Sequence, residues 1–259
     1  MDYLEKIENN PYEDLSWNIP EQKQGVVNIV GGNGGSFRAE VKIAEFIAGK
    51  YPLKEVRLVL PDALKQKLPE MPNFRFLEST ESGSFANGEE LATEFNGADY
   101  NVLLGDLSRN SVTGRAVVSA CANSEKPLLI TRDSVDLIAD NTPEKVLMNE
   151  NLVFLASVAQ LQKLLRAVYY PKMLLMSSSL VQVAEVLHKY TLSYPLGVVT
   201  LHNSQILVAQ NGIVKAVDLS KTGYLPMTFW GGEIAAKIAG MNLYNPHNFI
   251  QATVGALYA

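Results

Sequence analysis

The stretch Val26-Val27-Asn28-Ile29-Val30-Gly31-Gly32-Asn33-Gly34-Gly35-Ser36 decides how this chain folds. Its first five residues form a short apolar run that is typical of a buried strand, and the run stops at the glycine pair. Ser36 can cap a helix over the residues that follow, in which apolar side chains recur at helical spacing. A strand, a glycine-rich turn and an amphipathic helix in this order predict one unit of an α/β protein.

The same alternation continues along the chain. Short apolar runs, each followed by a turn or a helical stretch, occupy residues 56–60, 100–104, 127–130 and 153–155. Ser177 to Ser179 supply a cap for a helix that continues to about residue 190. Alternating strands and helices favour a parallel sheet with helices on both faces.

The pattern changes near the C-terminal end. Three short apolar runs at 197–201, 205–209 and 213–217 are separated by tight turns at 202–204 and Asn211-Gly212. Asn-Gly between apolar runs is a strong hairpin signal. We therefore expect an antiparallel C-terminal edge on a mostly parallel sheet, followed by two closing helices, 232–239 and 247–257.

The organisation of the chain is predicted to be simple. Residues 1–24 are acidic and contain proline and asparagine, which indicates a lead-in made of a short helix and an extended arm. Residues 25–259 show no repeat, no low-complexity tract and no linker. They are expected to form a single α/β domain, a size that one core can support.

Composition excludes several classes of function. The 259 residues include 22 Lys and Arg against 27 Asp and Glu, for a net charge of −5, which argues against a nucleic-acid partner because phosphate binding needs clustered cations. Cys121 is the single cysteine, so an internal disulfide and a cysteine metal site are excluded. No apolar segment is long enough to span a membrane, so no membrane partner is expected. The acidic N-terminus is not typical of a secretory signal. A reducing, cytoplasmic location is expected.

The glycine-rich loop is a candidate ligand-binding element. Gly32, Asn33 and Gly34 follow a buried strand and precede a helix, where a backbone without side chains can approach a ligand and free N–H groups can face an anion. The third glycine of the dinucleotide fingerprint is replaced by Phe37, and no Gly-Lys-Ser or Gly-Lys-Thr triplet follows. A plain tight turn is the alternative interpretation.

Gly231-Gly232-Glu233 is a second candidate, directly before a predicted helix. Two glycines at a helix start can present N–H groups to a phosphate, and a carboxylate beside them can take a hydroxyl proton. The alternative is an ordinary acidic residue in the first helical turn, where it complements the helix dipole.

Other polar residues carry weaker signals. Asp133 and Asp136 follow a predicted strand, where they either meet a ligand or Mg²⁺ at the carboxyl end of the sheet or cap the next helix. The three histidines show no spacing typical of a metal site, and we predict no protein-held metal.

In order and spacing, several segments resemble a known family. They are the lead-in Trp17-Asn18-Ile19-Pro20, the first strand and its loop, Tyr100-Asn101-Val102-Leu103-Leu104-Gly105, Lys126-Pro127-Leu128-Leu129-Ile130 with Asp133, the stretch 198–212, and Gly231-Gly232-Glu233-Ile234-Ala235-Ala236. Together they resemble the NAD(P)H-hydrate dehydratases of the ribokinase-like superfamily, over about residues 17–259.

This resemblance implies a three-layer α/β/α ribokinase-like fold and the nucleotide-driven dehydration of hydrated NADH or NADPH, with Mg²⁺ and ADP or ATP as cofactors. The substrate hydroxyl would be phosphorylated and the phosphate would then leave. Glu233 would be the base, with Gly231 and Gly232 holding an anion and His202 and Asn203 beside the nucleotide. Gly32, Asn33, Gly34, Gly105, Asp106 and Asp133 would face a small-molecule nucleotide substrate. A homo-oligomer is expected by the same analogy.

The chain departs from the family pattern at several loops. The family's Gly-Ser-Gly-Asp loop reads Trp230-Gly231-Gly232-Glu233, and an ungapped alternative puts Gly232 at the position of the acid. Glutamate also reaches one methylene further than aspartate. In place of the family's Thr-Pro-His-x-x-Glu segment, this chain has residues 156–160, which lack its polar groups. The family's Leu-Lys-Gly is replaced by Leu201-His202-Asn203, and its Gly-Pro-Gly-Leu-Gly loop is replaced by residues 105–109. Two alternatives therefore stay open: a catalytically degenerate relative that binds a nucleotide or assembles with partners, and a small-molecule kinase of the same superfamily.

Overall fold

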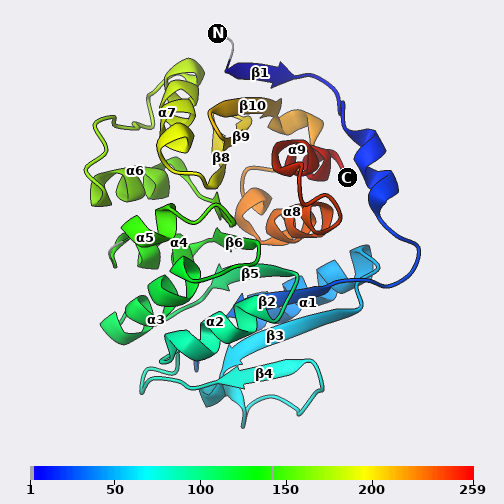
Figure 1. Cartoon of the computed structure of the whole chain (residues 1–259), viewed down its shortest axis with the longest axis vertical. Helices are drawn as coiled ribbons and strands as arrows, with labels where there is room; N and C mark the ends of the chain where they lie inside the picture. Colours follow the sequence, from blue (N-terminus) through cyan, green and yellow to red (C-terminus); the bar gives the residue numbers. More distant parts are fainter. Residues whose placement is uncertain (1–2, 142) are drawn as a thin grey trace.

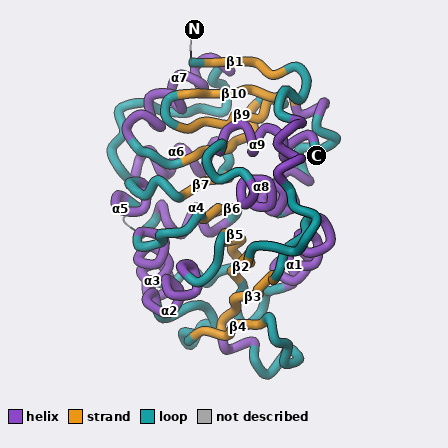
Figure 2. The backbone as a smooth tube through the Cα atoms, turned by 45° about the vertical axis from the view of Figure 1, so that its right-hand side comes forward, coloured by secondary structure: helices purple, strands orange, loops and turns teal. Residues whose placement is uncertain are grey.

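The computed structural model describes residues 3–141 and 143–259, and in these residues the apolar runs form one ten-stranded sheet. The strands are β1 (Leu4–Ile7), β2 (Val26–Gly31), β3 (Glu55–Pro61), β4 (Phe74–Leu77), β5 (Tyr100–Gly105), β6 (Leu128–Thr131), β7 (Leu152–Leu155), β8 (Gly197–His202), β9 (Gln205–Gln210) and β10 (Ile213–Asp218). Their order in the sheet is β1-β10-β9-β8-β7-β6-β5-β2-β3-β4. Figure 2 shows β1 and β4 at opposite ends of this sheet.

The directions of the strands confirm the prediction of a mostly parallel sheet with an antiparallel C-terminal part. Strands β8, β7, β6, β5, β2, β3 and β4 are parallel, whereas β9 pairs antiparallel with both β8 and β10. The N-terminal strand β1 then joins β10 in parallel, with Leu4 opposite Val214. The lead-in thus contributes an edge strand that the sequence did not indicate, followed by the short 3₁₀ helix η1 (Glu13–Asn18).

Helices cover both faces and complete a three-layer α/β/α fold (Figure 1). One layer holds α1 (Arg38–Lys50), α8 (Glu233–Tyr244) and α9 (Phe249–Tyr258). The other holds α2 (Gly88–Asn96), α3 (Ser111–Ala122), α4 (Asp133–Ala139), α5 (Glu144–Leu147), α6 (Val158–Ala167) and α7 (Leu180–Ser193). Shorter 3₁₀ helices are η2 (Asp62–Leu64), η3 (Leu219–Lys221) and η4 (Thr228–Trp230).

Two apolar cores lie on the two faces of the sheet because neighbouring strand residues point in opposite directions. In β2, Ile29 packs against the α1, α8 and α9 layer, whereas Val30 packs against the opposite layer. Leu104 and Leu103 divide in the same way in β5. All four side chains are fully buried, which explains why these strands read as continuous apolar runs.

The predicted turns and caps are confirmed in part. Asn203 and Ser204 have φ of 47° and 62°, and Asn211 and Gly212 have φ of 50° and 77°, so both hairpins turn through left-handed residues. Ser179 forms a capping box with Gln182 at the start of α7. The Ser36 cap was wrong: Phe37 is the N-cap of α1, because the Phe37 carbonyl accepts from the Val41 amide, whereas the Ser36 carbonyl accepts from the Asn33 amide.

None of the helices in the described part of the chain is both long and apolar enough to cross a membrane.

Candidate active site at the start of α8

Helix α8 begins at the carboxyl end of β5. Its N-cap, Gly232, has φ of 98°, and a Cβ placed there would lie 3.0 Å from Ile43 Cγ1 and 3.2 Å from Leu104 Cδ2. Glycine therefore allows the start of α8 to pack directly against α1 and the end of β5. No side chain caps α8, so its first N–H groups lack the usual side-chain acceptor.

Glu233 is the first residue of α8 and lies at the surface of this corner. Its carboxylate accepts a hydrogen bond from Lys42 Nζ of α1 at 2.9 Å, and its side chain is 35% exposed. Phe229, not Trp230, fills the core beneath the turn. The amide of Gly231 donates to the Thr228 carbonyl at 3.0 Å, so this predicted anion-binding group is used inside η4.

Tyr224 and Lys237 are two further polar residues whose electrostatics depend on Glu233. The Tyr224 hydroxyl is buried and has no hydrogen-bond partner in the described structure, and Lys237 Nζ lies 4.7 Å from the centre of its ring. Burial raises the pKa of Tyr224 to about 12, with a further contribution from the charge of Glu233. The hydroxyl is thus a buried hydrogen-bond donor without an acceptor in the described structure.

The glycine-rich loop follows β2 and is hydrogen-bonded to the end of β5. The Gly32 amide donates to the Gly105 carbonyl at 2.8 Å, and the Gly34 amide donates to the Gly83 carbonyl at 2.8 Å. The Asn33 side chain accepts from the Gly35 amide at 2.8 Å and donates to the Asp106 carbonyl. These polar groups of the loop are therefore engaged in holding the turn.

Asp106 and Asp133 also have partners within the fold. The Asp133 carboxylate accepts hydrogen bonds from the amides of Asp106, at 2.9 Å, and Leu107, at 3.2 Å. A Cβ on Gly105 would lie only 2.0 Å from Asp133 Oδ1, so the contact requires glycine there. Asp106 pairs with Arg132 at 3.1 Å. The structure brings these residues together, with Asp133 fastening the loop after β5 to the start of α4.

His202 and Asn203 belong to a different set of contacts. His202 is 2% exposed, and its Nε2 lies 2.6 Å from the Ser178 carbonyl oxygen and 3.0 Å from Asn203 Nδ2. These contacts fasten the end of β8 to the loop before α7, in the helical layer opposite α8. Asp136, the other acidic candidate, pairs with Lys163 and Gln160.

Two residues at this end of α1 were missed by sequence reasoning. Lys42 carried no signal beyond its charge. Glu40 is fully buried, and no other residue in the described structure offers either of its carboxylate oxygens a hydrogen bond. Burial raises its pKa to about 8. Its signal was its spacing, because Glu40 occupies the same helix face as Ile43, Ala44 and Ile47.

The described residues contain no group of three or more His, Cys, Asp or Glu side chains arranged to hold a metal ion. Asp106 and Asp133, the acids nearest the ends of β5 and β6, already have the partners given above. The donor set does not fit a resident Mg²⁺ ion.

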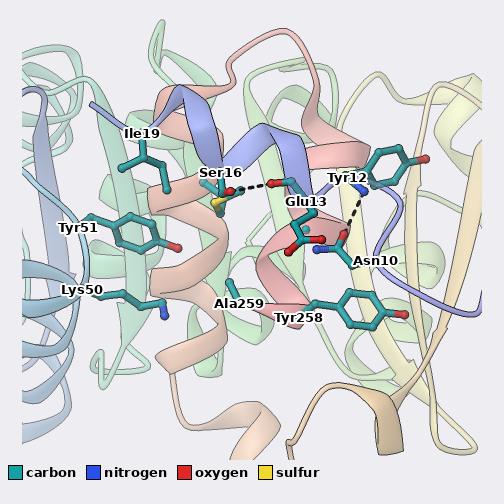
Figure 3. Close-up of a pocket in the computed structure, with 11 residues that line it drawn as sticks. Asn10, Tyr12, Glu13, Ser16, Ile19, Lys50, Tyr51, Tyr258 and Ala259 are labelled. Atoms are coloured by element: carbon teal, nitrogen blue, oxygen red, sulfur yellow. Dashed lines mark hydrogen bonds between the residues drawn. The ribbon is translucent and has the colours of Figure 1, made fainter. Parts of the chain in front are cut away.

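A separate cavity of about 300 Å³ lies beneath the N-terminal segment (Figure 3). Tyr12 and Ser16 line it from that segment, together with Lys50 and Tyr51 at the C-terminal end of α1 and Tyr258 of α9. Lys50 lies at the opposite end of α1 from Glu40. This cavity is therefore distinct from the corner at Glu233.

Neither a protein-family model nor a curated protein matches this sequence. Solved structures do share its fold. A ribokinase-like superfamily protein from Enterococcus faecalis V583 aligns with a TM-score of 0.65 and 14% identity, over 100% of this chain and 86% of the other. An ADP/ATP-dependent NAD(P)H-hydrate dehydratase from Bacillus subtilis, co-crystallised with ATP and Mg²⁺ and soaked with CoA, aligns with a TM-score of 0.60 and 14% identity, over 96% and 87%.

A hydroxyethylthiazole kinase from Pyrococcus horikoshii aligns with a TM-score of 0.53 and 14% identity, over 95% of this chain and 80% of the other. At such identities the likeness establishes the fold, which is ribokinase-like as expected, and leaves the chemistry to be argued from the site.

Proposed function

We propose that this chain is a nucleotide-dependent enzyme of the NAD(P)H-hydrate dehydratase type, acting on hydrated NADH or NADPH. The observation that carries the proposal is the position of Glu233, a surface carboxylate on the first residue of a helix that no side chain caps. This corner combines a proton acceptor with uncapped helix N–H groups at the carboxyl end of a parallel sheet, where ligands of α/β proteins bind.

The chemistry needs little covalent participation from the protein. Glu233 would take the proton of the substrate hydroxyl as its oxygen attacks the terminal phosphoryl group of ATP or ADP, and the bond to the bridging oxygen would break. Phosphate would then leave with the electrons of the C–O bond, while a neighbouring carbon loses a proton to water and its C–H electrons form the double bond. The α8 amides and Lys42 would stabilise the anionic oxygens.

Mg²⁺ would reach the site as part of the nucleotide substrate, because the described residues offer no resident metal site. The bound ion would neutralise phosphate charge. Lys42 has a corresponding role in the protein: it balances the charge of Glu233 in the resting enzyme and can turn to a phosphate when one is present.

The direct test is turnover of hydrated NADH by the purified protein with Mg²⁺ and either ATP or ADP, followed by the return of NADH absorbance. We expect turnover in the wild-type protein and a loss of at least about 100-fold in Glu233→Gln, which keeps the shape and removes the base. No turnover with either nucleotide would refute the proposal. Phosphorylated substrate without dehydration would instead identify a small-molecule kinase.

A catalytically degenerate, nucleotide-binding protein is a second candidate. It is supported by the number of expected site groups that the fold itself uses, namely the Gly231 amide, Asn33, Asp133 and His202. A protein of this kind would be stabilised by MgADP or MgATP in a thermal-shift assay and would release no product. Absence of any shift would exclude nucleotide binding altogether.

A further inference from the structure

Glu40 is a buried acid that the proposed chemistry does not use. Its side chain is fully buried in α1, and no other residue in the described structure offers either carboxylate oxygen a hydrogen bond. A buried, unpartnered polar group costs free energy, and an ionised one costs far more. Burial therefore raises the pKa of Glu40 to about 8 and favours its neutral, protonated form below that pH.

The position of Glu40 places it under the junction of β2 and β5. Its Oε1 and the Gly105 carbonyl oxygen each lie 2.6 Å from the point where a Cβ of Gly31 would be. Glycine at position 31, with φ of 156°, leaves this small space open between the two oxygens. The Glu40 carboxyl thus packs directly against the strand ends from which the glycine-rich loop and the loop of Asp106 emerge.

The charges that face Glu40 make its ionisation unfavourable. Asp106 and Asp133 oppose it, and Arg132 favours it, but Arg132 already pairs with Asp106 at 3.1 Å. Desolvation is the largest contribution and raises the pKa of Glu40 together with the two aspartates, and it outweighs a hydrogen bond from the backbone amide of Glu40 itself, which lowers it. Loss of the proton would leave three carboxylates around a single guanidinium, with no solvent at Glu40.

The first turn of α1 is the part that can yield. It has no side-chain cap, and Arg38 is exposed. The rest of the helix is anchored by Ile43, Ala44 and Ile47, which are between 0% and 5% exposed. The Lys42–Glu233 pair that joins this end of α1 to α8 is exposed and stabilises it by less than about 1 kcal/mol.

We propose that Glu40 is a proton-dependent positioning residue: its protonated carboxyl keeps the first turn of α1 and residues 31–35 closed over the strand ends, and loss of the proton opens this segment locally. Opening would expose the carboxylate to water and move Lys42 away from Glu233. The corner of the proposed active site would thereby become sensitive to pH, whichever reaction it performs.

Hydrogen exchange of the full-length protein tests this inference without any ligand. The pKa of Glu40 is about 8 in the closed form and ordinary when exposed, so local opening becomes about tenfold more favourable for each pH unit between roughly 4.5 and 8. Between about pH 5.5 and pH 7.5, we expect protection of a peptide covering residues 31–42 to fall about 100-fold, after correction for intrinsic exchange. A peptide from α7 reports global unfolding, which carries the same proton dependence, so local opening requires the 31–42 peptide to be less protected than the α7 peptide at each pH.

Glu40→Gln is the matched variant, because it keeps the size and polarity and cannot ionise. We expect its 31–42 protection to be independent of pH over the same range. An identical pH dependence in both proteins would overturn the proposal, and so would equal protection of the 31–42 and α7 peptides at every pH, which would show that residues 31–42 exchange only by global unfolding. If Glu40→Gln does not fold, Glu40→Met replaces it, and the comparison of the two wild-type peptides decides by itself.

Discussion

Replacing Glu40 by glutamine should change how the global stability of the protein depends on pH. Burial holds the pKa of Glu40 at about 8 in the folded state, against 4.5 as its ordinary value. The folded state therefore binds this proton more tightly than the unfolded state. Its contribution to stability is fully present below pH 4.5 and is lost progressively as the pH rises to 8.

The size of the effect follows from the pKa difference. One pKa unit corresponds to about 1.36 kcal/mol, so the free energy of unfolding of the wild-type protein should fall by up to roughly 5 kcal/mol across the whole window because of Glu40. Between pH 5.5 and pH 7.5 the fall is about 3 kcal/mol. Glu40→Gln lacks this contribution. The free energy of unfolding of the variant, relative to that of the wild type, should therefore rise by the same amount over this pH range.

Urea denaturation of the two proteins at these two pH values measures the difference directly. Because every other titratable group is shared, its contribution cancels in the comparison. Equal changes in the free energy of unfolding would show that Glu40 ionises normally in the folded state. The burial argument for Glu40 would then be wrong.

Three further predictions concern the site and its support. Gly105→Ala should lower the free energy of unfolding by roughly 3 kcal/mol, since its Cβ would lie 2.0 Å from Asp133 Oδ1 at a φ of 125°. The control Gly49→Ala, which meets nothing within 4 Å, should raise it by up to about 1 kcal/mol, both measured by thermal unfolding. Ser179→Ala should cost about 1 kcal/mol by removing the α7 capping box, and an unchanged melting temperature would contradict this. Lys42→Met should change stability by less than about 1 kcal/mol in the same assay, because the pair with Glu233 is exposed; a larger loss would show that the pair holds α1 to α8.

Much of the fold could be predicted because its signals are local. The apolar runs of β2, β5 and β6 and the Asn-Gly hairpin each depend on a few consecutive residues, which can be recognised in the sequence. The strand β1 could not be predicted, since Leu4 and Ile7 are separated by charged residues and the strand forms only by pairing with β10, at the far end of the chain. The place of β4 at the other edge of the sheet likewise depends on tertiary contacts.

The candidate site was only partly predictable for the same reason. The sequence indicated a glycine-rich helix start with an acid at Glu233, and the structure has both. The sequence could not show that the Asp133 carboxylate would accept hydrogen bonds from two backbone amides or that His202 would be buried. Lys42 meets Glu233 only because Gly232 lets α8 approach α1.

The most direct test of the proposed active site is a crystal structure of the protein with MgADP or MgATP. Our account predicts that the terminal phosphate rests against the first amides of α8, beside the Glu233 carboxylate and within reach of Lys42. A nucleotide whose phosphates lie elsewhere in the fold would contradict it.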